Sequence, residues 1–355
     1  MPTLEILDTT RIDERDSAFP QAVQLPDGDV LCSFSVGGGA NVTGGTDWAR
    51  STDGGLTWTH EGTILPHDPR TNLANFLKLS LARDGGTVYA YGATIDDDLT
   101  DPFGHRDADA VLCRSIDAGR TWSPPTPVPM PLDCPLEVSY AALTLQSGRL
   151  LAPAGTLPHP DRLGEHVFVA ISDDGGVTWP QHSVPFHDES GKLGFFEHKF
   201  AQLPSGRVLA TAWTVTLGDY RDQPNSFVLS DDDGLTWGPV HSTGIHGQTM
   251  TPLPLGDDRL LVLYNRRHGD QAIVACLVTF NEQSWQVRHE AILYDAHARY
   301  RRPEDVETGI DELDSFAFGF PTAVPLQDGN VLATHWCVED GVCGIRATRL
   351  RIDWP

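Results

Sequence analysis

The sequence contains no long apolar run, which excludes one class of protein at the outset. No stretch approaches the about 18 consecutive apolar residues that a membrane-spanning helix needs. The first residues, MPTLEILDTTRIDERD, also lack the basic and apolar regions of a secretory signal peptide. We therefore expect a cytoplasmic protein without a transmembrane helix.

Positive charge is scarce. The chain has 25 Lys and Arg residues against 49 Asp and Glu residues, which gives a formal net charge of −24. Such an acidic surface repels phosphate backbones and anionic lipids, so we expect neither a nucleic-acid partner nor a membrane partner. Wherever basic residues gather, they run against the composition of the whole chain and point to a local purpose.

Cysteine is sparse as well, with six residues scattered along the chain. Only Cys337 and Cys343 lie close together, and no pair has the spacing of a zinc site. We expect these cysteines to be reduced and mostly structural. We also expect no organic cofactor, and no ligand spacing in the sequence predicts a metal ion.

Glycine and proline, by contrast, are abundant. The 355 residues include 34 Gly and 26 Pro, and these are spread along the chain rather than pooled in a linker. This distribution is typical of many short strands joined by turns. With 40% hydrophobic residues the chain can bury a large core, so an all-β architecture is indicated.

One octapeptide recurs as Ser-x-Asp-x-Gly-x-Thr-Trp. Asp and Gly suit a tight hairpin turn, the Asp carboxylate can accept backbone N–H bonds, and Trp can pack the turn onto its sheet. A worn copy that is one residue short ends at Trp285. The four full copies are STDGGLTW from Ser51, SIDAGRTW from Ser115, SDDGGVTW from Ser172 and SDDDGLTW from Ser230.

A second repeat is an apolar strand, a turn that begins at a leucine and usually contains glycine, and another apolar strand. Its six marker leucines are Leu25, Leu81, Leu145, Leu203, Leu255 and Leu326. Six hairpins at this spacing predict a six-bladed β-propeller over residues 1–355 as one domain, and two β-sandwiches are the alternative. Too little chain follows the last hairpin for a full blade. We therefore expect the strand near Leu4–Thr10 to complete it and close the ring.

These octapeptides resemble the Asp-boxes of the sialidase superfamily, and the resemblance covers nearly the whole chain. It implies that the boxes lie on the outer rim of the blades and carry no chemistry. It also leaves function open, because Asp-box propellers include sialidases, arabinan-cleaving hydrolases, polysaccharide lyases and binding modules. Function must then be sought where the innermost strands begin, about six residues before each marker leucine.

The resemblance can be carried over position by position, and it holds only in part. The first arginine of the sialidase carboxylate clamp is replaced by Ala18, the second by Trp213, and the nucleophilic tyrosine by Phe320. The glutamate of the family corresponds to Glu197, and the third arginine to the pair Arg266 and Arg267. The acid/base aspartate of the family has one nearby candidate here, Asp47. Tyr140 or Tyr300 remains as a substitute for the lost tyrosine.

The remaining candidates come from the strand ends themselves. Glu137 occupies the end of the blade next to that of Glu197, and two carboxylates on adjacent blades suit glycoside hydrolysis. In a regular strand Lys199 would share the face of Glu197, with His198 on the opposite face. Further candidates for contact with a substrate are Lys78, Trp213, His246 and Phe320.

Three functions remain open from the sequence. The first is a glycoside hydrolase that acts on a non-sialic sugar through Glu197 and Glu137, with Asp47 as a reserve acid. The second is a lyase for uronic-acid-containing glycans, in which Arg266 or Arg267 neutralises the carboxylate and His246 or a tyrosine removes a proton. The third is a carbohydrate-binding propeller without catalysis.

Overall fold

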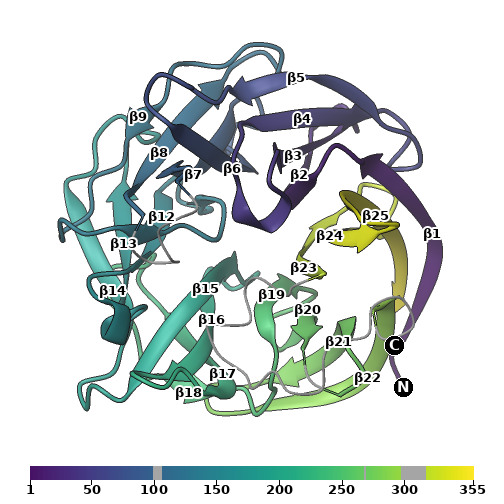
Figure 1. The fold of residues 1–355 in the computed structure, drawn as a ribbon. Helices are drawn as coiled ribbons and strands as arrows, with labels where there is room; N and C mark the ends of the chain where they lie inside the picture. The colour runs from purple at the N-terminus through teal and green to yellow at the C-terminus, as the bar shows by residue number, and fades with distance from the viewer. Residues whose placement is uncertain (99–105, 268, 297–316) are drawn as a thin grey trace.

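The computed structural model describes residues 1–98, 106–267, 269–296 and 317–355, and these form six β-sheets arranged around a central axis (Figure 1). The fold is an all-β, six-bladed propeller, as the repeats predict. Two short 3-10 helices, Gly39–Asn41 and Pro160–Arg162, are the helical elements of the described chain, and no helix there is long and apolar enough to cross a bilayer.

The blades follow one another along the chain, and each runs from the axis outward. Blade 1 contains β2 (Ser17–Gln24), β3 (Val30–Val36), β4 (Thr46–Ser51) and β5 (Thr59–Leu65). Blade 2 contains β6 (Leu73–Leu81), β7 (Val88–Asp96), β8 (Ala108–Ser115) and β9 (Thr126–Pro127). Blade 3 contains β10 (Leu136–Glu137), β11 (Leu143–Thr144), β12 (Leu150–Thr156), β13 (His166–Ser172) and β14 (Gln181–His187).

The second half of the ring repeats this order. Blade 4 contains β15 (Leu193–Gln202), β16 (Val208–Thr216), β17 (Asp222–Ser230) and β18 (His241–Ser242). Blade 5 contains β19 (Gln248–Pro254), β20 (Arg259–Arg266), β21 (Ala272–Phe280) and β22 (Trp285–Asp295). Blade 6 contains β23 (Phe318–Pro325), β24 (Val331–Glu339), β25 (Val342–Asp353) and β1 (Thr3–Asp13).

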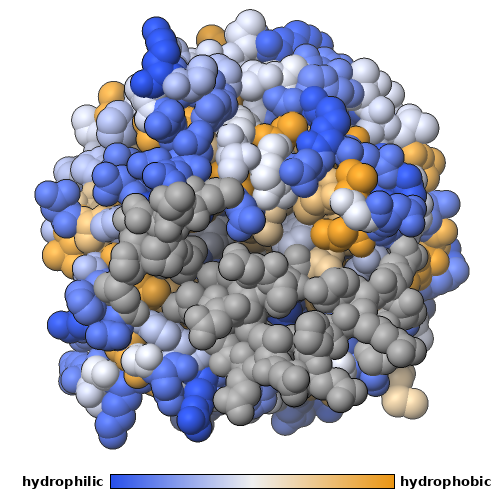
Figure 2. All heavy atoms as spheres, viewed as in Figure 1, coloured by the Kyte–Doolittle hydropathy of each residue, from blue (hydrophilic) through white to orange (hydrophobic). Residues whose placement is uncertain are grey.

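The last blade joins the two ends of the chain. β1 is its outermost strand and pairs antiparallel with β25, from Thr3 opposite Asp353 to Asp13 opposite Ile345. The expected closure of the ring by the N-terminal strand is therefore confirmed. Hydrophilic side chains dominate the part of the surface that is coloured in Figure 2, as the acidic composition requires.

Each Asp-box forms the turn between the third and fourth strands of its blade, held by its own side chains. In the second box the Asp117 carboxylate accepts bonds from the Thr121 hydroxyl at 2.7 Å, the Thr121 amide at 2.8 Å and the Ser115 hydroxyl at 2.8 Å. These bonds favour the ionised carboxylate and lower the pKa of Asp117 to about 2. The turn is thus a self-contained polar unit on the outer rim.

The fifth position of each box is glycine because the neighbouring blade leaves no room for a side chain. A Cβ atom at Gly55 would lie 2.6 Å from Cδ1 of Leu332 in blade 6. Its backbone is also left-handed, with φ at 92°. The same contact recurs between Gly119 and Leu31, Gly176 and Leu112, and Gly234 and Leu151. The box glycines therefore allow each blade to pack closely against the preceding blade.

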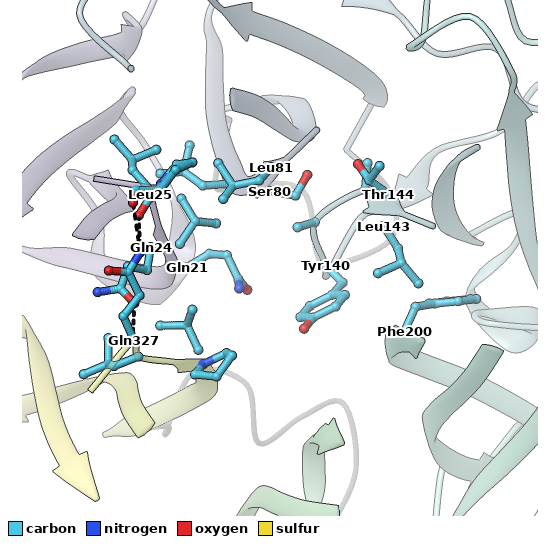
Figure 3. A pocket seen from close by; sticks show the side chains of 18 residues that line it. Gln21, Gln24, Leu25, Ser80, Leu81, Tyr140, Leu143, Thr144, Phe200 and Gln327 are labelled. Atoms are coloured by element: carbon cyan, nitrogen blue, oxygen red, sulfur yellow. Dashed lines mark hydrogen bonds between the residues drawn. The ribbon is translucent and has the colours of Figure 1, made fainter. Parts of the chain in front are cut away.

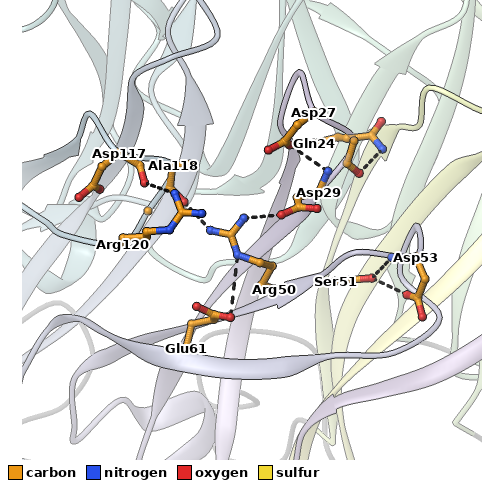
Figure 4. Close-up of polar contacts among 12 residues, drawn as sticks. Gln24, Asp27, Asp29, Arg50, Ser51, Asp53, Glu61, Asp117, Ala118 and Arg120 are labelled. Carbon is orange, nitrogen blue, oxygen red and sulfur yellow. Dashed lines mark hydrogen bonds and ion pairs between the residues drawn. The ribbon is translucent and has the colours of Figure 1, made fainter.

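Arginine adds a polar contact to this seam. Arg50, at the end of β4, donates to the Ala118 carbonyl in the second Asp-box at 2.6 Å (Figure 4). The same guanidinium forms an ion pair with Asp29 at 2.6 Å, and its side chain is 9% exposed. Arg149 likewise reaches the carbonyl of Asp233 in the fourth box. The boxes are fixed by the preceding blade through both apolar and polar contacts.

Replacing Gly55 by alanine should lower stability by about 2–4 kcal/mol, because a left-handed alanine is strained and its methyl group overlaps Leu332. Gly206 is a matched control, since its φ is 96° and a Cβ atom there would meet no atom within 4 Å among the described residues. Gly206→Ala should therefore show the strain without the overlap. Chemical denaturation of both variants measures the difference, and equal losses would contradict the packing role of Gly55.

Candidate functional site

The innermost strands of four blades are interrupted by a β-bulge near their first residues. In β2, β15, β19 and β23 two residues oppose one on the neighbouring strand. In β2, β15 and β23 the first bulged residue is Phe19, Glu197 and Phe320, with φ at 55°, 46° and 49°. Left-handed backbone at a residue other than glycine costs about 1–3 kcal/mol and concentrates at functional sites. Each of these residues lies six positions before its marker leucine, where the sequence places the site.

Blade 3 has a larger interruption at the same level. Its innermost strand is split into β10 and β11, so residues 138–142 face residues 152–154 on β12 without regular pairing. The freed carbonyl of Val138 accepts a bond from Lys78 Nζ at 2.8 Å, and that of Ser139 accepts from Lys199 Nζ at 2.6 Å. Two lysines from the flanking blades thus hold the broken strand.

Both lysines are fully buried, with an exposed fraction of 0%, and both lie against aromatic rings. Lys78 Nζ is 3.8 Å from the ring centre of Phe76 and 5.3 Å from that of Phe320. Lys199 Nζ is 4.1 Å from the ring centre of Phe320 and 5.3 Å from that of Tyr140. Cation–π attraction partly replaces the water that the ammonium groups lose. The two lysines and these aromatic rings form one buried cluster among the innermost strands, called the plug below.

Glu137 and Glu197 meet beside this plug. The Glu197 amide donates to both carboxyl oxygens of Glu137, at 3.2 Å each. Glu137 is 9% exposed, and Gly155 lies opposite it on β12, where a Cβ atom would come within 3.1 Å of Glu137 Oε2. Glycine at that position therefore leaves space for the carboxyl group. Glu197 is half-buried, so this end of the pair is open to solvent.

The surroundings of Glu137 raise its pKa. Burial, and then the charge of Glu197, raise the pKa of Glu137 to about 8, although Lys199 and Lys78 pull it down. Burial lowers the pKa of Lys199 to about 8 and that of Lys78 well below its usual value. These surroundings favour the protonated form of Glu137, which lies next to a second carboxyl group.

His198 lies behind the pair. Its ring is fully buried, and Nδ1 is 3.7 Å from Glu137 Oε2. Burial, with Lys199 nearby, lowers the pKa of His198 to about 3, so the imidazole is neutral. Strand alternation places His198 away from the carboxylates, but the bulge at Glu197 breaks that alternation. His198 is thus a neighbour of Glu137 that the sequence does not reveal.

Asp47 is not brought to this cluster. It lies on β4, where its carboxylate contacts His60 at 2.9 Å, Thr63 at 2.7 Å and Arg15 at 3.0 Å. His60 and Thr63 belong to β5, the outermost strand of blade 1. Asp47, the predicted reserve acid, is thus already paired with Arg15, His60 and Thr63 rather than with Glu137 or Glu197.

Several candidates for substrate contact are buried and already have partners within the protein. Trp213 is 5% exposed, packs on Phe196 and donates its indole N–H to Asp222, so it offers no ring face to a sugar. The ammonium groups of Lys78 and Lys199 are used inside the plug, and Phe320 is 3% exposed beneath them. These four residues shape the site from below rather than from its surface.

The two arginines diverge. Arg266 turns outward and pairs with Glu290 on β22 at 3.0 Å. Arg267 turns inward, is 6% exposed, and donates to the Gln248 side chain at 2.9 Å and to the Phe318 carbonyl. His246 lies in an exposed loop just before β19. Tyr300, which the sequence offers with Tyr140 as a substitute for the lost tyrosine, lies outside the described residues.

Comparison with known proteins identifies the family. The model of the BNR repeat-like domain matches residues 100–332. A sialidase from Micromonospora viridifaciens is 27% identical over 245 residues, a match that covers 62% of this chain. The match covers only 36% of that relative, so the chain spans about a third of its length.

Solved structures show the same fold. A protein of unknown function from Dyadobacter fermentans is 23% identical, with a TM-score of 0.77 over 99% of this chain and 100% of that one. An α-L-arabinanase from Penicillium chrysogenum, solved with arabinobiose, is 16% identical, with a TM-score of 0.65 over 97% of this chain and 98% of that one. At these identities the likeness concerns the fold alone.

Proposed function

Since the chain belongs to the family of BNR repeat-like domains, within the sialidase superfamily of propellers, we propose that it is a glycoside hydrolase that acts on a sugar other than sialic acid. The observation that carries the proposal is the pairing of Glu137 and Glu197 at the start of two adjacent inner strands. Glycoside hydrolysis uses two carboxyl groups in different protonation states.

The two carboxyl groups take different roles. Glu137, whose pKa is raised to about 8, gives its proton to the glycosidic oxygen as the bond between that oxygen and the sugar breaks. Glu197, half-buried and at the bulge, provides the carboxylate that stabilises positive charge developing on the sugar or receives a proton from attacking water. Lys78 and Lys199 act through the backbone, because they hold the segment that follows Glu137.

The loss of arginines at the clamp positions argues against an acidic sugar. A sialidase grips the substrate carboxylate with three arginines, and this chain has Ala18 and Trp213 at two of those positions. Both residues are buried, at 0% and 5% exposed. Arg267 alone cannot reproduce a bidentate clamp, since its guanidinium already binds Gln248 and Phe318. A neutral sugar is the better match.

We therefore expect the purified protein to release no sialic acid from α-linked sialosides at a useful rate. The missing clamp and the phenylalanine at position 320 remove the nucleophile and most of the carboxylate recognition. A rate at least about 10⁴-fold below that of an active sialidase corresponds to about 5–6 kcal/mol of lost transition-state stabilisation. A fluorogenic sialoside measures this, and efficient turnover would overturn the proposed substrate class.

The test of hydrolysis is a panel of neutral glycosides and oligosaccharides that includes arabinan fragments, because an arabinanase shares the fold. Hydrolysis should appear as new reducing ends and should vanish in the double variant Glu137→Gln/Glu197→Gln. A product that absorbs in the near ultraviolet would indicate a lyase, and binding without turnover would indicate a carbohydrate-binding module. Either result would contradict the hydrolase. The lyase has weaker support, because Arg266 pairs outward with Glu290 and His246 lies in an exposed loop.

A further inference from the structure

A hollow lies on the propeller axis, at the end opposite the carboxyl pair. All five contributing inner segments run from the Glu137 and Glu197 level toward their marker leucines, and the hollow is formed where they end. Its volume is about 560 Å³, within the range of small-molecule sites. In Figure 3 Gln21 and Tyr140 point into it from opposite sides.

The hollow is separate from the carboxyl pair. The ring of Tyr140 forms part of its wall, and Lys199 Nζ lies 5.3 Å from the centre of that ring. The buried ammonium groups and Phe320 therefore stand between the two ends of the axis. A molecule bound in the hollow would not touch Glu137 or Glu197.

The described residues that line the hollow include no charged side chain. Leucine, valine, alanine and proline make up most of the lining, and the polar groups are amides and hydroxyls of glutamine, serine, threonine and tyrosine. In a chain with a net charge of −24, an uncharged surface at the centre of the ring selects against ions. It favours a neutral ligand with a largely apolar body.

Three oxygen atoms of this lining lack a hydrogen-bond partner among the described residues. They are Gln21 Oε1, Ser80 Oγ and Thr144 Oγ1. Gln21 is only 5% exposed, so its carbonyl oxygen has also lost bulk water. Ser80 and Thr144 come from the neighbouring strands β6 and β11. Buried polar atoms without partners are costly, and a bound group that donates a hydrogen bond would remove that cost.

By contrast, the backbone amide of Gln327 and the side-chain amide of Gln24, both at the rim of the hollow, already form hydrogen bonds within the protein. The Gln327 amide N–H donates to Gln24 Oε1 at 2.7 Å, and Gln24 Nε2 donates to the Gly28 carbonyl at 2.9 Å. These bonds fix the edge of the hollow between blades 6 and 1, and the one between Gln327 and Gln24 is drawn in Figure 3. The unpartnered oxygens of Gln21, Ser80 and Thr144 therefore lie in the inner wall, with almost no exposed surface of their own, and Gln21 Oε1 meets a ligand when the side-chain amide turns toward the hollow.

We propose that this hollow is a second binding site, for an uncharged and mostly apolar small molecule that carries a hydroxyl group, such as a phenol or an aryl alcohol. Its apolar body packs on the leucine-rich wall, and its hydroxyl group donates to Gln21 Oε1, which the side-chain amide presents to the hollow by rotating about its last bond. The site does not depend on the hydrolase proposal, because it contains neither carboxyl group of the pair.

The test titrates β-naphthol with the purified protein and follows the fluorescence of the naphthol. We expect saturable binding at one site, at least about tenfold tighter than that of the methyl ether of β-naphthol, which cannot donate. In Gln21→Met the acceptor is lost, and the two ligands should bind within about twofold of each other. Equal binding of both ligands to the wild type, or no binding, would overturn the site.

Two further variants locate the binding. Val324 is half-buried in the wall, and Val324→Phe should fill the hollow and weaken β-naphthol binding by at least about tenfold while leaving glycoside hydrolysis unchanged. Glu197→Gln should leave naphthol binding unchanged, because Glu197 lies on the other side of the plug from the hollow. Circular dichroism checks the fold of each variant. Binding that responds to Glu197→Gln and not to Val324→Phe would assign the naphthol to the other end of the axis and contradict the proposal.

Discussion

Replacing Glu197 by glutamine should lower kcat/KM on the natural substrate by at least about 100-fold, the scale of a lost acid–base or charge-stabilising group. The change removes the carboxylate and keeps the side-chain shape. The bond from the Glu197 amide to Glu137 is made by the backbone and is retained. The thermal midpoint should therefore change little. Steady-state kinetics and a melting curve measure the two effects separately.

The matched control is Glu189→Gln, which removes the same charge from an exposed position on the segment before β15. It should leave kcat/KM within about twofold of the wild type, since surface substitutions of this kind act weakly. If Glu197→Gln keeps full activity, the spacing argument fails. The site should then be sought around Glu137 and Arg267.

The fold could be predicted because its determinants are local and repeated. Each Asp-box builds its own turn from side chains within eight residues, as Ser115, Asp117 and Thr121 do. The marker leucines count the blades, and the alternation of Leu4–Thr10 identifies an edge-closing strand. What the octapeptide does not reveal is the reason for its glycine, because Leu332, which excludes a side chain at Gly55, lies in another blade.

The candidate site could be predicted in position but not in detail. The spacing from the marker leucines places Glu197 at a bulge and Glu137 beside it. Alternation along a regular strand fails there, since the bulge turns His198 toward Glu137. Lys78 is expected to contact a substrate, yet it is fully buried, because a carbonyl freed by the broken strand of blade 3 receives its ammonium group. No pattern in the sequence marks that break.

Replacing Glu137 by glutamine should have an effect that depends on the leaving group. On an oligosaccharide or alkyl glycoside the loss should reach at least about 100-fold, because the departing oxygen needs the proton of Glu137. On a nitrophenyl glycoside the loss should stay below about tenfold, since nitrophenolate leaves without protonation. Glu197→Gln should instead impair both substrates. Steady-state kinetics of the two variants on the two substrates give a four-way comparison, and equal losses for Glu137→Gln would contradict its role as the acid.

The pH profile tests the same assignment without a change at Glu137. The pKa of Glu137 is raised to about 8 and the protonated form is the active one, so activity on an alkyl glycoside should be present below this pH and lost as the pH rises through it. The charged and titratable groups facing Glu137 are Glu197, Lys199, Lys78 and His198.

Lys199→Met removes a cation that lowers the pKa of Glu137, so the alkaline limb of the pH profile should move to higher pH. The exposed control Lys192→Met should leave the limb in place. Because Lys199 itself titrates near pH 8, the limb belongs to the coupled pair in the wild type and to Glu137 alone in the variant. A limb that stays fixed, or moves to lower pH, would show that the proton lost in this range is not that of Glu137.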